Sequence, residues 1–209
     1  MMQQFLALDP QPRHTDLGEG CHVDLHDALS PQAAREAMER LRVELPWWQE
    51  VYRRGAAGNV VPAPRLTSFH GDAHCRYTYS GIRYAPHPWH PVLIELRTHL
   101  VRLTQHPFNS VLCNLYRDGR DSVGYHADDE PELGPSPDNI VIASLSLGAP
   151  RRFVLKHRRT GASRVYSLGE GRLLVMRGHT QRHYVHALPK TSRQVGARIN
   201  LTFRVVSPG

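Results

Sequence analysis

The chain has few cysteines and no long apolar run. Cys21, Cys75 and Cys113 are odd in number, widely spaced and without a CxxC pair, which argues against a disulfide framework or a cysteine zinc site. The longest apolar stretch, around residues 140–147, contains serines and is too short to span a bilayer. Residues 1–12 lack the basic and apolar regions of a signal peptide. We therefore expect a cytoplasmic protein that has no membrane contact.

Lysine is also scarce, since only Lys156 and Lys190 occur among 26 basic residues, and the rest are arginines. With 19 acidic residues the formal charge is +7, which favours polyanionic partners such as nucleic acid. An arginine bias can equally come from genomic base composition. The hydrophobic content of 40% and the length of 209 residues are typical of one folded domain.

The first half of the sequence predicts two helices after an irregular start. Residues 1–28 are rich in Pro, Gly, Asp and His without clear periodicity, so we predict an irregular segment there and one domain over 29–206. Ser30 followed by Pro31 is typical of a helix start, and the apolar spacing continues to Pro46. A second leucine-striped helix is predicted from Pro91 to about His106.

The second half predicts strand after strand. An alternating segment at 77–81 ends in a turn and indicates a hairpin region before this half begins. Short strands separated by glycine-containing breaks suggest a barrel or a jelly roll. The fold class predicted is therefore α+β, with helices preceding a β core. The core strands are expected at 110–117, 140–147, 151–158, 172–177, 182–188 and 196–206.

One H-x-D pair has the setting of a metal site. Four such pairs occur, so the spacing alone is weak. His126 and Asp128 follow a strand-like segment, and residues two apart on an extended backbone point the same way. A non-haem iron site needs two histidines and one carboxylate. His186 is the favoured third ligand, although His157, His179 and His183 are alternatives, and any of these histidines could instead be a surface or core residue.

The segment from Arg198 to Arg204 alternates polar and apolar residues without exception. Its apolar face can pack between sheets, whereas burying its two arginines is costly unless an anion meets them. A small dicarboxylate such as 2-oxoglutarate would satisfy both, or one arginine could pair with Asp128. The alternative is an exposed edge strand with solvated arginines.

In order and spacing these motifs resemble the AlkB family. The shared motifs are Asn114-Leu115-Tyr116, Asp118-Gly119, His126-Ala127-Asp128-Asp129-Glu130, His186-Ala187-Leu188-Pro189 and Arg198 to Arg204, and the similarity runs from about 62 to 206. The resemblance implies a double-stranded β-helix (jelly-roll) core at 109–206, with helices and a β-hairpin nucleotide-recognition lid at 29–108. It also implies that His126, Asp128 and His186 are catalytic ligands of Fe(II). The cosubstrate 2-oxoglutarate, used with O2, would be held by Asn114, Tyr116, Arg198, Asn200 and Arg204.

The resemblance further implies direct-reversal DNA repair by an Fe(II)- and 2-oxoglutarate-dependent dioxygenase. The reaction would demethylate N-alkylated bases such as 1-methyladenine and 3-methylcytosine, coupled to 2-oxoglutarate decarboxylation. The partner would be alkylated DNA or RNA, and the protein is expected to be a monomer. An oxygenase acting on RNA or protein is the alternative enzyme, and a non-catalytic jelly-roll binding module is the alternative outside enzymes.

Base recognition requires unstacking, and flat side chains commonly hold a flipped base. By resemblance Tyr77 and Tyr79 take this role, although tyrosines in a strand often serve ordinary packing. Asp129 and Glu130 could contact the base edge or form a solvated acidic loop. Phosphate contacts supply affinity without sequence information, and the candidates for them are Arg65, Arg76, Arg151, Arg152, Arg158, Arg159 and Arg193.

Overall fold

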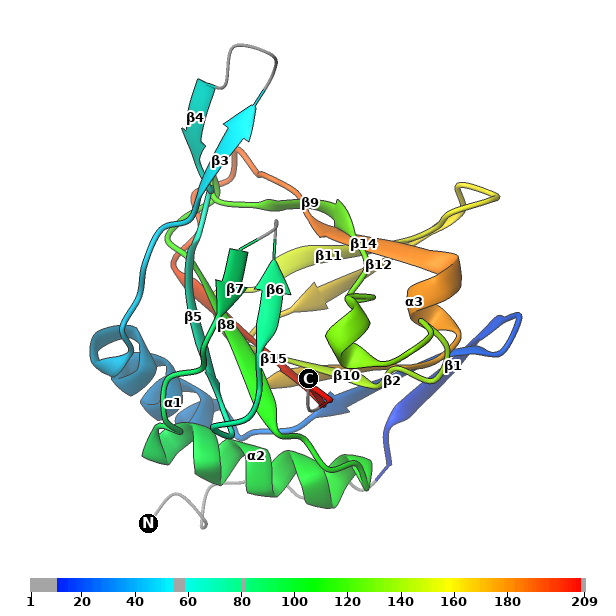
Figure 1. The fold of residues 1–209 in the computed structure, drawn as a ribbon, viewed down its shortest axis with the longest axis horizontal. Helices are drawn as coiled ribbons and strands as arrows, with labels where there is room; N and C mark the ends of the chain where they lie inside the picture. Colours follow the sequence, from blue (N-terminus) through cyan, green and yellow to red (C-terminus); the bar gives the residue numbers. More distant parts are fainter. Residues whose placement is uncertain (1–10, 55–58, 80–81, 208–209) are drawn as a thin grey trace.

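A computed structural model describes residues 11–54, 59–79 and 82–207 of the chain, which form two antiparallel sheets that enclose a pocket (Figure 1). The larger sheet has the order β1-β2-β13-β10-β15-β8-β5. Its strands are β1 (Arg13–Gly18), β2 (Cys21–Asp27), β13 (Arg172–Gly178), β10 (Ile142–Gly148), β15 (Arg198–Arg204), β8 (Ser110–Tyr116) and β5 (Leu66–Gly71).

The smaller sheet has the order β12-β11-β14-β9. Its strands are β12 (Ser163–Leu168), β11 (Arg151–His157), β14 (Tyr184–Leu188) and β9 (Val123–His126). Two separate hairpins pair β3 (Val51–Arg54) with β4 (Asn59–Pro62) and β6 (Tyr77–Tyr79) with β7 (Ile82–Tyr84). The antiparallel sheets are consistent with the expected jelly-roll core.

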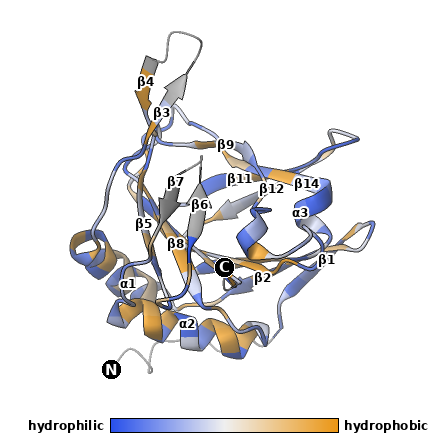
Figure 2. Ribbon diagram, in the orientation of Figure 1, coloured by the Kyte–Doolittle hydropathy of each residue, from blue (hydrophilic) through white to orange (hydrophobic). Residues whose placement is uncertain are grey.

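Two helices cover the outer face of the larger sheet. They are α1 (Pro31–Glu44) and α2 (Pro91–Thr104). The Ser30 hydroxyl accepts a hydrogen bond from the backbone N–H of Ala33 and so caps α1 where the sequence places its start. Figure 2 shows α2 with alternating apolar and polar residues, and its leucines join one apolar cluster with strands of the sheet. In the described part of the chain, no helix is long and apolar enough to cross a membrane.

The predicted irregular start is wrong for residues 13–27. These residues form the β1–β2 hairpin, and β2 extends the larger sheet by pairing with β13. The signal in the sequence was a short alternation in which Cys21 and Val23 are buried and their neighbours are not. The Gly and Asp residues made this alternation hard to recognise, because the glycines lie in the turn and the aspartates on the outward face.

The terminal strand β15 lies in the middle of the larger sheet, between β10 and β8. The sequence suggested that its apolar face packs between the two sheets. Instead, Ile199, Leu201 and Phe203 pack in the apolar cluster that contains the helices. The polar row therefore faces the pocket, and Arg198 and Arg204 are each only 1% exposed. The alternative of an exposed edge strand is excluded.

We expect the free energy of unfolding to fall as the pH drops below about 6.5, the pKa of an unfolded histidine. Burial lowers the pKa of His99, whose Nε2 lies 2.8 Å from the carbonyl oxygen of Ala28. The unfolded state therefore binds more protons below that pH. The stabilisation is complete above it and is lost as the pH falls toward the folded pKa, by up to about 1.4 kcal/mol per pH unit.

Urea unfolding at pH 7.5 and pH 5.0 tests this expectation. The variant His99→Gln keeps a side-chain donor but cannot titrate, so it should lose less stability between the two pH values than the wild type. An identical pH dependence in both proteins would show that His99 does not titrate on unfolding.

Candidate metal centre and cosubstrate pocket

Two histidines and one aspartate converge between the sheets. His126 ends β9, His186 lies in β14, and the strand register places the two directly opposite each other. Asp128 follows His126 by two residues, is buried, and has its Oδ2 3.5 Å from Nε2 of His186. One ligand atom from each of the three lies within 4.8 Å of the others. This is the two-histidine, one-carboxylate arrangement of a non-haem iron site.

The hydrogen bond of His126 leaves the correct nitrogen free for a metal. Its Nδ1 lies 2.9 Å from the carbonyl oxygen of Gly124. A carbonyl oxygen can only accept, so Nδ1 carries the proton of the neutral ring and Nε2 keeps a lone pair. Metal-binding histidines are commonly oriented in this way by a backbone carbonyl.

The charge state of the other two residues also suits a cation. Burial, together with the neighbouring His126, lowers the pKa of His186 to about 3, so the ring is neutral at pH 7, as a metal ligand must be. Burial, the largest single influence, raises the pKa of Asp128, but the charge of Arg204 together with His186 and His126 outweighs it and holds that pKa below its ordinary value. Nη2 of Arg204 lies 3.4 Å from Oδ1 of Asp128.

Gln181 fixes the backbone at Asp128, a role that sequence reasoning missed. Residues 180–183 form a one-turn helix, α3 (Thr180–His183), whose last two residues fall in the strand predicted at 182–188. The buried side-chain oxygen of Gln181 accepts from the backbone N–H of Asp128 at 3.0 Å. Only the fold brings these two residues together, since 53 positions separate them.

The residues expected to hold the cosubstrate form cross-strand pairs. Arg198 lies opposite Tyr116, and Asn200 lies opposite Asn114, on the adjacent strands β15 and β8. All four line the pocket that also contains the two histidines and Asp128. The alternation read from the sequence therefore places these side chains on one face, as period-two strands require.

Arg198 is a buried cation, and no carboxylate of the described residues forms an ion pair with it. Its Nη2 donates to Oγ of Ser146 and to Oδ1 of Asn200, both at 2.7 Å. Among the described residues its Nε has no hydrogen-bond partner. Burial and, to a lesser extent, the neighbouring charge of Arg151 lower the pKa of Arg198 to about 10. The guanidinium is therefore cationic at neutral pH, and an anionic ligand fits this place.

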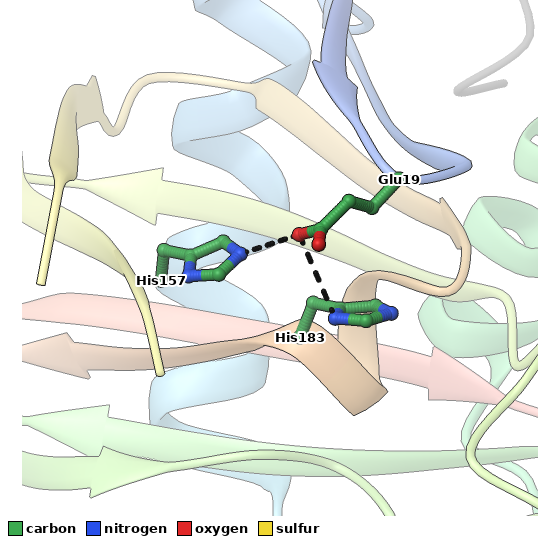
Figure 3. A group of neighbouring side chains, drawn as sticks. All are labelled: Glu19, His157 and His183. Carbon is green, nitrogen blue, oxygen red and sulfur yellow. Dashed lines mark hydrogen bonds and ion pairs between the residues drawn. The ribbon is translucent and has the colours of Figure 1, made fainter. Parts of the chain in front are cut away.

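A second group of metal-ligand residues lies away from the pocket and is not a suitable metal site (Figure 3). Nε2 of His157 is 2.7 Å from Oε2 of Glu19, and Nδ1 of His183 is 3.7 Å from the same oxygen. Nδ1 of His157 accepts from the backbone N–H groups of Arg159 and Thr160 at 3.2 and 3.1 Å. The ring proton is therefore on Nε2, the nitrogen that a metal would need.

This second group instead ties the β1–β2 turn to the smaller sheet. Glu19 also accepts from Arg159 at 3.0 Å, and the hydrogen bonds from His157 and Arg159 lower the pKa of Glu19. Glu19 has the left-handed φ of 53° that L-residues seldom adopt. The contacts of its carboxylate hold the turn in that conformation.

The four residues expected to contact the base lie in two places, a separate hairpin and the loop after the metal motif. The backbone of Tyr77 and Tyr79 lies in the β6–β7 hairpin, but their side chains lie outside what the structure describes. Asp129 is exposed and pairs with Arg158 at 3.2 Å. Glu130 is not a solvated loop residue, because its carboxylate turns toward Arg204, with Oε2 and Nη1 3.8 Å apart.

Two of the arginines expected to contact phosphate serve other purposes. Arg65 is 5% exposed, and its Nε donates to Oδ1 of Asn114 at 3.0 Å. Arg151 is 3% exposed and donates to backbone carbonyl oxygens, including that of Asp118. Arg76 donates to the carbonyl oxygen of Ala73. The remaining candidates are exposed, namely Arg152, Arg158, Arg159 and Arg193.

The comparisons with known proteins agree with this geometry. Residues 22–204 match the family model of the 2OG-Fe(II) oxygenase superfamily. The chain is 43% identical to the human alpha-ketoglutarate-dependent dioxygenase alkB homolog 3, over 99% of this chain and 77% of that protein. It is 38% identical to the human DNA oxidative demethylase ALKBH2, over 94% of this chain and 77% of that protein.

The chain matches only part of the length of some relatives, and it also matches a solved structure. The chain spans 64% of the bovine alkB homolog 3 and 61% of the mouse protein, at 43% and 44% identity. The solved structure of OsALKBH1 aligns with a TM-score of 0.63 at 15% identity, over 92% of this chain and 99% of that one, which shows a shared fold. The chain therefore belongs to the 2OG-Fe(II) oxygenase superfamily and, within it, to the AlkB-type dioxygenases.

Proposed function

We propose that this protein removes N-linked methyl groups from alkylated nucleic-acid bases, such as 1-methyladenine and 3-methylcytosine, and thereby repairs DNA directly. The observation that carries the proposal is that one pocket holds both the two-histidine, one-carboxylate group and the buried Arg198, which has no carboxylate partner among the residues that the structure describes. The relatives named as alkB homolog 3 and as a DNA oxidative demethylase support this choice of substrate.

His126, Asp128 and His186 would hold Fe(II), and Arg198 would bind a carboxylate of 2-oxoglutarate. Bound Fe(II) supplies the oxidation of the N-methyl carbon by O2 at the expense of 2-oxoglutarate, which yields succinate and CO2, while the base leaves with formaldehyde as the other product. The protein's own part is to position these groups and to exclude competing reactions.

Asn114 has the orientation that a cosubstrate ligand needs. Its Oδ1 accepts from Nε of the buried Arg65 at 3.0 Å, so its Nδ2 group is left to donate elsewhere in the pocket. On the opposite strand, Asn200 uses Oδ1 to accept from Arg198 and Nδ2 to donate to Thr202 at 2.9 Å. The two asparagines thus differ in role, since Asn114 offers a donor and Asn200 orients the arginine.

Arg204 connects the metal ligand to the acidic loop. It lies between the carboxylates of Asp128 and Glu130 and so fixes the direction of the chain after the metal motif. Asp129, between them in the sequence, is exposed and paired with Arg158, and it would be the carboxylate that contacts a base edge. The β6–β7 hairpin would serve as the lid that carries Tyr77 and Tyr79 toward the base.

The test is mass spectrometry of single-stranded and duplex oligonucleotides that contain one methylated base. They are incubated with the protein, Fe(II), ascorbate and 2-oxoglutarate, and succinate is measured in parallel. We expect the loss of one methyl group per lesion only when 2-oxoglutarate is present. Continued succinate formation without methyl loss from any oligonucleotide would overturn the proposed substrate and point to an oxygenase acting on RNA or protein.

A further inference from the structure

A groove of about 580 Å³ adjoins the metal pocket on its outer side. The groove and the pocket share three lining residues, Arg65, Val123 and His126, so they adjoin each other. The groove runs between the edge strand β9 and the base of the β3–β4 hairpin, which lie at the same end of the molecule in Figure 1. Its other lining residues are Tyr52, Val61, Pro62, Pro64, Ser122, Gly124, Tyr125 and Lys190.

Tyr125 gives this groove an exposed aromatic surface. It is 55% exposed, so its ring is accessible to a ligand in the groove. Nζ of Lys156 lies 5.5 Å from the centroid of its ring, and Lys190 lines the groove itself. One lysine is therefore beside the Tyr125 ring and the other lines the same groove, and both positive charges favour an anionic ligand.

The second tyrosine of the groove is held in place by its hydroxyl group. The hydroxyl of Tyr52 donates to Oε2 of Glu50 at 2.8 Å and accepts from Nη2 of Arg65 at 3.1 Å. Glu50 and Arg65 are both buried, so the anchor lies inside the protein. Tyr52 is therefore a fixed part of the groove wall, together with Pro62 and Pro64.

We propose that this groove binds the nucleotide next to the target base, with the neighbouring base stacked on Tyr125 and its phosphate beside Lys190. Aromatic side chains beside cations bind unpaired bases without sequence preference. A neighbour inside a duplex is stacked and paired, so its flat face is not available. The inference rests on the proposed function and adds to it a binding site for the nucleotide beside the target base.

The first measurement is the affinity of single-stranded oligonucleotides by fluorescence anisotropy, with Mn(II) and 2-oxoglutarate bound to the full chain. Tyr125→Ala should weaken binding by about tenfold, because one stacked base is lost. Tyr125→Phe keeps the ring and should bind like the wild type. As a matched control, Val165→Ala changes an apolar residue that is 50% exposed on β12, at the opposite edge of the same sheet, and should have no effect.

The second measurement places an abasic residue on either side of the methylated base. On one side it should weaken wild-type binding about as much as Tyr125→Ala does, and the two changes together should weaken it no further. Additive effects on both sides, or equal losses for Tyr125→Ala and Tyr125→Phe, would overturn the groove assignment. If binding follows this pattern but no methyl group is removed, the groove stands and the proposed function fails.

Discussion

The variant His186→Ala is expected to lose iron and at least about a hundredfold of its activity. His186 is one of the three ligands we propose for the iron, and changes even to residues that only support metal ligands commonly cost ten- to about a hundredfold. Two protein ligands would remain, too few to complete the face that the iron site requires. Two measurements check this: titration with Mn(II) and the rate of succinate formation. We expect one bound ion per wild-type chain and none per variant chain.

The second histidine and glutamate group supplies the matched control. His157 is buried and lies 2.7 Å from a carboxylate oxygen, much as His186 does near Asp128, but its Nδ1 accepts backbone N–H groups. We expect His157→Ala to bind one ion per chain, like the wild type. If His157→Ala lost the ion and His186→Ala kept it, the metal would bind at the group of Glu19, His157 and His183, and our assignment of the metal site would be wrong.

The variant Arg198→Met is expected to raise the KM for 2-oxoglutarate by about 30-fold or more, with a smaller change in kcat. Removing one partner of a buried, hydrogen-bonded charge pair costs at least about 2 kcal/mol of binding free energy, which corresponds to that factor. Initial rates of succinate formation over a range of 2-oxoglutarate concentrations give both constants. An unchanged KM would place the cosubstrate carboxylate elsewhere.

The variant Arg151→Met is the control, because it shows what removing a buried arginine does when that arginine does not bind the cosubstrate. Arg151 is as buried as Arg198, but its donors go to the backbone carbonyl oxygens of Asp118, Asp121 and Pro189. Arg151→Met leaves these acceptors without their donor, so we expect a lower Tm. The KM of the folded fraction should stay within about twofold of the wild type, because none of those bonds reaches the cosubstrate.

Local periodicity in the sequence predicted several elements correctly. The spacing of apolar residues and the Ser30–Pro31 pair placed α1, and most core strands lie within two residues of their expected ends. The alternation from Arg198 to Arg204 predicted a buried polar face with two arginines. These features were accessible because side-chain direction along one strand or helix repeats with a fixed period.

Other features depended on contacts between distant segments. The β1–β2 hairpin is stabilised by pairing with β13, and nothing in residues 13–27 alone indicates that partner. Arg65 looked like any surface arginine until the fold placed it against Asn114, 49 positions away. The same holds for Gln181 at the amide of Asp128.

The sequence by itself determined the kind of chemistry, because H-x-D on an extended chain and a strictly alternating arginine strand each confine side chains to one face. It left four histidines as candidates for the third ligand. The tertiary structure decided among them, since the register of β14 against β9 sets His186 opposite His126. It also decided that the other cluster is not a metal site, because backbone N–H groups occupy Nδ1 of His157 and place its proton where a metal would bind.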